Sequence, residues 1–241
     1  MSTRFDALAQ LYEESFELPW RRDLESYTVL GLLGDLAGAS VLDLGCGSGD
    51  YCRALRRAGA GRVVGYDTSE GMIEHASRRE SREALGIEYT TTPPPAGSFD
   101  VVLGVYVLPY AEDYRALTEL CALAGRALRD GGRFVTLPVN PDFDPRPDYY
   151  ARYGFRLYDA EPRSDASRVT LELVFSAYHE VVTARHWSRP TLVKALTEAG
   201  FTGIDWPGYR VSPDGRGTHG PDFWSPYLHR PHAALITAVS S

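Results

Sequence analysis

The fold is decided by the stretch Val41-Leu42-Asp43-Leu44-Gly45-Cys46-Gly47-Ser48-Gly49-Asp50. Its first apolar residues predict the end of a buried parallel strand, and the run 51–58 after it predicts a helix. Three glycines at alternate positions predict a sharp turn, because glycine tolerates unusual backbone angles and lets a ligand approach the backbone. The turn leads into a helix N-terminus, where free N–H groups favour a negatively charged group.

The spacing of the glycines separates two kinds of nucleotide site. Dinucleotide-binding folds use G-x-G-x-x-G, but the position of that third glycine is Asp50 in this chain. A second acid, Asp67, ends the next apolar run, 62–67, at the offset of about 20 residues where a carboxylate meets a ribose. Asp43 and Asp67 therefore form a pair, of which one can hold a cationic amino-acid end and the other can accept ribose hydroxyls. The spacing disfavours a nicotinamide oxidoreductase.

This pattern resembles the class I S-adenosylmethionine-dependent methyltransferases, by motif over roughly positions 40 to 140 and by element order elsewhere. Over its whole length the chain is also similar to the toxoflavin synthase-like small-molecule methyltransferases. The cues for the narrower resemblance are Phe5-Asp6, Ala9, Tyr12, Leu18-Pro19-Trp20-Arg21, Gly86-Ile87-Glu88-Tyr89, Asp130-Gly131-Gly132-Arg133-Phe134-Val135 and Phe223-Trp224. The resemblance implies an α/β, Rossmann-like, mostly parallel seven-stranded sheet of order 3-2-1-4-5-7-6 with helices on both faces.

The resemblance also implies S-adenosyl-L-methionine as the cofactor. The residues expected to contact it are Tyr12, Asp43, Gly45, Cys46, Gly47, Asp67, Thr68, Met72, Gly104 and Val105. Met72 is expected against the adenine ring, although a core position is the alternative. Many relatives place an acid after the third strand to accept from the adenine amino group. Here the third strand, 86–90, is followed by Thr91-Thr92-Pro93, which contains no acid.

The methyl acceptor is expected at the carboxyl ends of the strands, where strand order reverses. The fourth strand and its exit, 99–108, flank that point, and the proline-rich loop 140–147 leaves the same edge. The candidate substrate-binding residues are Trp20, Arg21, Tyr106, Tyr110, Asn140, Phe143 and Trp187. The alternative for each aromatic residue is packing in the core.

The length of 241 residues fits one α/β domain. Within it we expect an N-terminal helical cover over 1–38, a cofactor-binding core over 39–142, and a substrate cap over 143–188 made of an inserted antiparallel strand pair. A C-terminal helix and strand hairpin are expected over 189–241, with a loop over 207–232. The insertion could cap the substrate pocket or pair two subunits, so a homodimer is possible.

Composition narrows the partners and the compartment. The net charge is −7, with 25 basic residues dispersed among 32 acidic ones, which disfavours nucleic acid as a partner. The cysteines, Cys46, Cys52 and Cys121, form no C-x-x-C pair, so we expect no metal site, no disulfide framework and a reducing cytoplasm. No apolar run approaches membrane-spanning length, and no signal peptide is visible, so we expect no membrane partner.

Methyl transfer needs no nucleophilic side chain, because the sulfonium cofactor supplies the leaving group and the protein supplies orientation. A base is needed only for a weakly acidic acceptor, and His179, His186 and His219 are candidates by residue type. The first hypothesis is N-methylation of a small heteroaromatic precursor of secondary metabolism. The alternatives are O- or C-methylation of a phenolic natural product, and a non-catalytic subunit that binds S-adenosylmethionine.

Overall fold

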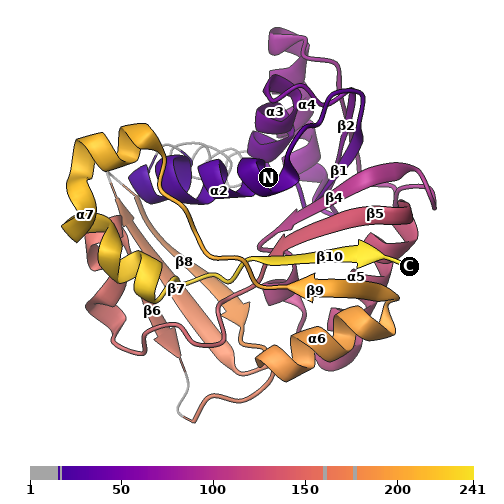
Figure 1. Ribbon diagram of the computed structural model, residues 1–241. Coiled ribbons are helices and arrows are strands. Elements are labelled where there is room, and N and C mark those ends of the chain that lie inside the picture. The colour runs from indigo at the N-terminus through magenta and orange to yellow at the C-terminus, as the bar shows by residue number, and fades with distance from the viewer. Residues whose placement is uncertain (1–15, 17, 160–161, 176–177) are drawn as a thin grey trace.

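The computed structural model describes residues 16, 18–159, 162–175 and 178–241, and its main feature is a seven-stranded sheet (Figure 1). The order is β3-β2-β1-β4-β5-β10-β9, which confirms the predicted order 3-2-1-4-5-7-6. These strands are β3 (Ile87–Thr90), β2 (Arg62–Tyr66), β1 (Ser40–Leu44), β4 (Phe99–Val105), β5 (Leu128–Leu137), β10 (Ile236–Ser240) and β9 (Phe201–Asp205). Strands β1 to β5 pair in parallel, and β10 is antiparallel to both of its neighbours.

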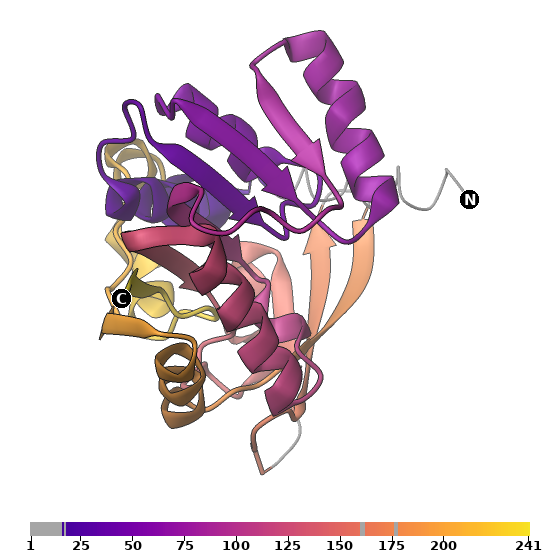
Figure 2. The same ribbon diagram turned by 90° about the vertical axis from the view of Figure 1, so that its right-hand side faces the viewer.

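Both faces of this sheet are covered by helices (Figure 2). Side chains alternate between the faces of a strand, so Leu103 packs with one hydrophobic cluster and Val102 with another. The cluster around Leu103 contains residues of α2 (Tyr27–Leu33) and α3 (Asp50–Arg57), whereas the cluster around Val102 contains residues of α5 (Tyr114–Ala127) and α6 (Arg189–Glu198). The remaining helix of this core is α4 (Glu70–Glu83), which connects β2 to β3.

The insertion forms a separate antiparallel sheet with one more strand than expected. Its order is β6-β7-β8, with β6 (Phe155–Asp159), β7 (Arg168–Phe175) and β8 (Tyr178–Arg185). The predicted pair corresponds to β7 and β8, and β6 was missed because its five residues carry only a short alternation. A third hydrophobic cluster joins this sheet to the π-helical turn η1 (Trp20–Ser26), the 3₁₀ segment η3 (Pro147–Tyr153) and α7 (Pro213–His229).

Helix α7 lies within the stretch 207–232, which was predicted to be a loop; that prediction was wrong. The prolines and glycines of this stretch suggested a loop, but the segment is a helix kinked at Gly220, where φ is 68°. Ser212 caps its start by accepting a hydrogen bond from the Gly215 N–H at 2.9 Å, and Pro213 takes the first helical position, where no N–H is needed.

The sheet brings several chain segments to one edge. The carboxyl ends of β1, β2, β4 and β5 lie there, together with the start of the antiparallel β10, and η1 and the 3₁₀ turn η2 (Leu108–Tyr110) lie beside that edge. In an open α/β sheet this edge is where ligands bind. Among the described residues, no helix combines the length and apolar character that a membrane span requires.

Candidate functional site

The turn after β1 has the backbone that its glycines predict. Gly45, Gly47 and Gly49 have φ values of 70°, 53° and 82°, which favour glycine. A Cβ on Gly45 would lie 2.5 Å from Cγ2 of Val107, and one on Gly49 would overlap the Tyr89 ring. A Cβ on Gly47 would meet nothing within 4 Å. Gly47 is therefore the glycine of the turn beside which a ligand has open space.

The amides of this turn are bonded within the protein. Gly45 and Cys46 donate to the Tyr66 carbonyl at 2.7 and 3.0 Å, and Gly47 donates to Oδ2 of Asp67 at 2.9 Å. The end of β2 therefore already satisfies these three turn amides, which precede the helix N-terminus where free N–H groups were expected. A ligand beside Gly47 instead meets a carboxylate, which suits hydroxyl or cationic groups better than a pyrophosphate.

A buried arginine holds the residues that follow the turn. Arg53 is 2% exposed and donates to the Ser48 carbonyl at 2.8 Å and to Oδ1 of Asp50 at 2.5 Å. The Ser48 hydroxyl donates to the other oxygen of Asp50 at 2.7 Å. Asp50, which replaces the glycine of a dinucleotide site, thus fixes the start of α3.

Asp67 lies at the end of β2 with both carboxylate oxygens directed at backbone. Oδ2 accepts from Gly47, and Oδ1 accepts from the Ser69 N–H at 2.9 Å. Each oxygen keeps a further lone pair, so the carboxylate can still accept hydroxyl groups. Ser69 caps α4 by accepting a hydrogen bond from the Met72 N–H. Beside this site the Thr68 side chain is exposed and Met72 is 7% exposed.

Asp43 is buried, although it was expected to contact the cofactor. It is 2% exposed, and its Oδ2 accepts from Sγ of Cys52 at 3.1 Å. Burial raises the pKa of Asp43 to about 7; the Cys52 hydrogen bond partly offsets this rise, and the charges of Asp67 and Asp50 add to it. The structure therefore places Asp43 beneath the turn, where any effect on a ligand is electrostatic.

Tyr106 stands at the exit of β4 in a backbone conformation that is unusual for a side chain of its size. Its φ is 58°, which costs about 1–3 kcal/mol for a residue other than glycine. Its hydroxyl donates to Oε2 of Glu25 and lies 3.2 Å from Nε2 of His232. Gly104 is buried, whereas Val105 and Tyr106 are both half-buried at this sheet edge.

Glu25 is the centre of a buried polar cluster at that edge. Its side chain has no exposed surface and comes from η1. Oε1 accepts from Nε of Arg21 at 3.1 Å and from the Tyr51 hydroxyl at 3.0 Å, and Oε2 accepts from Tyr106. One carboxylate therefore ties η1, α3 and the tip of β4 together.

The direction of these hydrogen bonds fixes the tautomer of His232. Because Tyr106 donates to a carboxylate, its oxygen must accept from Nε2–H of His232. Nδ1 then accepts from the Tyr227 hydroxyl, 2.6 Å away. Burial, with Arg21 nearby, lowers the pKa of His232 to about 3, so the ring is neutral at physiological pH.

Two buried donors beside this cluster have no hydrogen-bond partner among the described residues. They are Nε1 of Trp20, whose ring meets the His232 ring edge-on at 5.0 Å, and the hydroxyl of Tyr209, whose ring meets Tyr227 at 5.6 Å. A buried donor without a partner costs about 1–3 kcal/mol.

Other residues predicted to bind substrate lie in different surroundings. Tyr110 is 55% exposed on η2. Asn140 donates from its N–H to the His232 carbonyl at 2.8 Å, and Phe143, fully buried, lines the same cavity as Asn140. Trp187 is 2% exposed in the hydrophobic cluster that contains α6, so the structure gives it the packing role that was the alternative. Tyr12 lies outside the described residues.

The histidines predicted as bases are not part of the Glu25 cluster. His179 is exposed on β8 and pairs with Glu172 at 2.7 Å. His186 is buried, with its ring nitrogens 3.2 and 3.3 Å from backbone carbonyls, and His219 stacks on Phe223. The histidine at the sheet edge is His232, which sequence reasoning missed. The sequence did place His232 just before the last predicted strand. Because an antiparallel strand begins where its parallel neighbours end, this position puts His232 at the edge where ligands bind.

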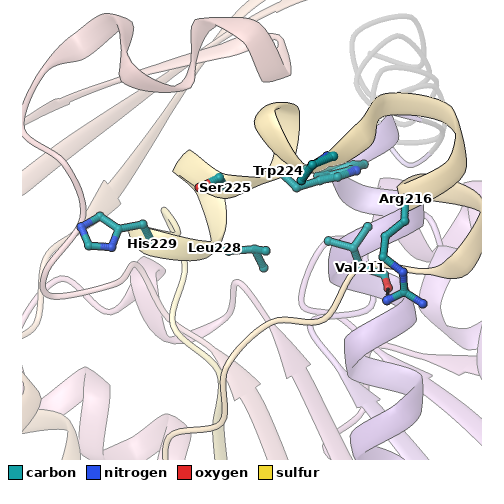
Figure 3. Close-up of a pocket in the computed structure, with 7 residues that line it drawn as sticks. Val211, Arg216, Trp224, Ser225, Leu228 and His229 are labelled. Atoms are coloured by element: carbon teal, nitrogen blue, oxygen red, sulfur yellow. Dashed lines mark hydrogen bonds between the residues drawn. The ribbon is translucent and has the colours of Figure 1, made fainter.

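A cavity of about 470 Å³ lies in the bend of α7, away from the glycine turn (Figure 3). The residues that line it are Val211, Arg216, Pro221, Trp224, Ser225, Leu228 and His229. Arg216 donates from Nη1 to the Val211 carbonyl at 2.8 Å across one end. No predicted site residue lines this cavity, and the described residues contain no cluster suited to a metal ion.

The model of the methyltransferase domain family matches residues 41–132. A demethylmenaquinone methyltransferase of Lactococcus lactis is 38% identical over 50% of this chain and 50% of its own length. A ubiquinone biosynthesis O-methyltransferase of Bradyrhizobium diazoefficiens is 34% identical over 45% of this chain and 43% of its own. The chain thus spans about half the length of these curated relatives.

A solved S-adenosylmethionine-dependent methyltransferase from Mesorhizobium loti superposes with a TM-score of 0.63 at 23% identity, covering 93% of this chain and 99% of its own. At that identity the likeness concerns the fold. The matched segment 41–132 contains the glycine turn, Asp67 and β4. Residues 41–132 therefore match the methyltransferase domain family, and the chain as a whole has the fold of a solved S-adenosylmethionine-dependent methyltransferase.

Proposed function

We propose that this chain is an S-adenosylmethionine-dependent methyltransferase that acts on a small molecule. The observation that carries the proposal is Asp67, whose carboxylate lies against the open Gly47 backbone at the reversal point of the sheet. A carboxylate there suits the ribose hydroxyls and positive charge of the cofactor. The matching domain family and the two curated methyltransferases support the same activity.

The residues fit the cofactor without further change. Gly47 leaves room for it, Asp67 would accept its ribose hydroxyls, and Met72 would pack on adenine. When bound, the cofactor supplies a methyl group on a positively charged sulfur. The protein's part is to orient the acceptor and to exclude water.

We place the acceptor beside Tyr106 and the Glu25 cluster. This cluster lies at the tip of β4, next to the glycine turn through Tyr51, and its neighbours Trp20 and Tyr209 hold unused donors. Donors without partners suit an acceptor that carries carbonyl or hydroxyl oxygens. Aromatic rings around them suit a flat molecule.

The acceptor atom divides the proposal into two candidates. The first is nitrogen on a heteroaromatic ring. The second, oxygen or carbon on a phenolic ring, is favoured by the unused donors and by the names of the relatives, which concern menaquinone and ubiquinone. Either acceptor releases a proton when an X–H group is methylated, so a dependence on pH does not separate the two.

A methyl-transfer assay tests the proposal. The protein is incubated with S-adenosylmethionine labelled in its methyl group and a panel of phenols, quinols and N–H heterocycles, and the product is identified by mass spectrometry. Label on a ring oxygen or carbon supports the second candidate, and label on a ring nitrogen supports the first. Cofactor binding without transfer to any member would favour the non-catalytic subunit.

Tyr106→Phe is the matched variant for this assay. It keeps the ring but removes the hydroxyl that joins Glu25 to His232. We expect at least about a tenfold lower rate with cofactor affinity unchanged. Tyr114→Phe on the far helix α5, which removes a hydroxyl bonded to Glu198 of α6, serves as the control and should keep the wild-type rate.

A further inference from the structure

A second cavity, of about 630 Å³, lies where four chain segments meet. The segments are the loop after β5, the residues from 162 to the start of β7, the start of α6 and the end of α7. The residues that line it are Asn140, Asp142, Phe143, Pro145, Arg163, Arg189, His229 and Arg230. His229 also lines the cavity in the bend of α7 (Figure 3). Neither the glycine turn nor Tyr106 contributes to this second cavity.

The lining of this cavity is positive although the chain is acidic. Three guanidinium groups face it with one carboxylate, Asp142, whereas the whole chain has 32 acidic and 25 basic residues. Arg163 is paired with Asp159. Arg189 and Arg230 form no ion pair with the described residues. Both side chains are exposed, and the charge of Arg230 also acts on Asp144, but a negatively charged group in the cavity would be attracted by both arginines.

The arginines are held so that donors remain available. The Arg163 guanidinium lies 3.7 Å over the Phe143 ring and donates from Nη1 to the Phe143 carbonyl at 2.9 Å, while its Nη2 is buried without a partner among the described residues. Arg189 lies 4.1 Å over the Trp206 ring. Stacking fixes the plane of a guanidinium and leaves its edge free to donate.

The backbone around the third arginine is also fixed. The carbonyl of Arg230 accepts from the Tyr150 hydroxyl at 2.9 Å, and its N–H donates to the Pro226 carbonyl at 3.0 Å. Asn140 closes another side, because its Nδ2 donates to the Pro231 carbonyl at 2.7 Å. The cavity wall is thus built on ordered backbone from β5, α7 and the segment before β10.

We propose that this cavity binds a small oxyanion, a carboxylate or a phosphate, through Arg189 and Arg230. Planar guanidinium groups match the paired oxygens of these anions and bind them through charge-assisted hydrogen bonds. The anion would be either the carboxylate of an aromatic compound or free phosphate. Anion binding at this cavity can be measured whether or not the protein transfers a methyl group, so a failure of one proposal does not affect the other.

Saturation-transfer difference NMR with benzoate tests the proposal, with benzamide as the uncharged analogue. Wild-type protein should give a benzoate signal well above the benzamide signal. The double variant Arg189→Gln/Arg230→Gln should bind benzoate about tenfold more weakly, because two charge-assisted contacts are lost. Arg115→Gln is the control: Arg115 is highly exposed on α5, outside the cavity, and this variant should behave as wild type.

The single variants Arg189→Lys and Arg230→Lys keep the charge and guard against a folding defect in the double variant. Each lysine variant should bind benzoate more weakly than wild type and more strongly than the double variant Arg189→Gln/Arg230→Gln. Inorganic phosphate is then added at constant ionic strength. Displacement of benzoate assigns the site to free oxyanions, and retention assigns it to carboxylates on aromatic rings. Equal benzoate and benzamide signals, or a double variant that binds like wild type, would overturn the proposal.

Discussion

Glu25 is the residue on which the buried contacts at the tip of β4 depend. Glu25→Gln removes the charge that balances Arg21 and replaces one acceptor oxygen with a donor. Removing one partner of a buried ion pair typically costs about 3–5 kcal/mol, so we expect the free energy of unfolding to fall by about 3 kcal/mol. Urea denaturation followed by circular dichroism measures this change.

The control for Glu25→Gln is Glu119→Gln, which changes an exposed partner of Arg115 on α5. Exposed ion pairs contribute about 0–1 kcal/mol, so this variant should unfold close to wild type. Equal stabilities for the two variants would show that the Glu25 cluster is not a buried ionic network.

The raised pKa of the single Asp43 carboxyl group makes the stability of the protein depend on pH. Its folded pKa of about 7 lies above the ordinary aspartate value of 3.8, so the folded state holds a proton that the unfolded state has released between these pH values. The stability that Asp43 contributes is therefore present at low pH and is lost as pH rises from about 4 to 7. The loss amounts to about 4 kcal/mol at most.

Asp43→Asn removes that titration. The difference in unfolding free energy between the variant and wild type should shift in favour of the variant as pH rises from 4 to 7, and should stay constant above about pH 8. Denaturant midpoints across this range measure the difference. A difference that does not change with pH would mean that Asp43 titrates normally.

Among the structural elements, the glycine turn after β1 offers two substitutions, Gly45→Ala and Gly47→Ala, that should destabilise the protein by different amounts. Gly47→Ala places a side chain in a left-handed conformation but into open space, which costs about 1–2 kcal/mol. Gly45→Ala meets the same strain and also drives a Cβ to 2.5 Å from Val107. We expect Gly45→Ala to destabilise the protein by at least about 1 kcal/mol more than Gly47→Ala.

Val107→Ala supplies the double-mutant test of this contact. In that background the extra cost of Gly45→Ala should disappear, because the clashing methyl is gone, while the cost of Gly47→Ala should not change. Thermal unfolding of the six proteins gives the comparison. An extra cost that persists without Val107 would place its origin in the backbone alone.

Some elements of this fold could be predicted from the sequence and others could not. The glycine turn, Asp67 and the strand order were predictable, because φ requirements, apolar runs and chain order act locally or follow a recurrent topology. Helix α7 was not predicted, since its prolines and Gly220 read as a loop. Ser212-Pro213-Asp214 at its start was nevertheless a helix-start signal.

The Glu25 cluster could not be predicted in the same way. Its members come from η1, α3, the exit of β4 and the segment before β10, so only the folded sheet edge brings Glu25 and His232 together. The second cavity likewise depends on four separate segments. Contacts of this kind follow from tertiary packing, which residue periodicity does not encode.

At the scale of the whole molecule, the three cysteines report on the integrity of the fold. Cys46, Cys52 and Cys121 are free and buried, and burial raises the pKa of Cys121 to about 12. A thiol reagent at pH 8 should label none of them quickly in the native protein and all of them after denaturation without reductant. Rapid labelling of a native thiol would contradict this packing, and incomplete labelling after denaturation would indicate a disulfide.

We propose that Asp67 and the open backbone at Gly47 form the cofactor site, and isothermal titration with S-adenosylmethionine measures binding there. Wild-type protein should bind the cofactor, and Asp67→Asn should bind at least about tenfold more weakly, because one ribose acceptor becomes a donor. Asp214→Asn, an exposed acid at the start of α7, should bind like wild type. Absence of binding to wild type, or equal affinity for wild type and Asp67→Asn, would contradict the account.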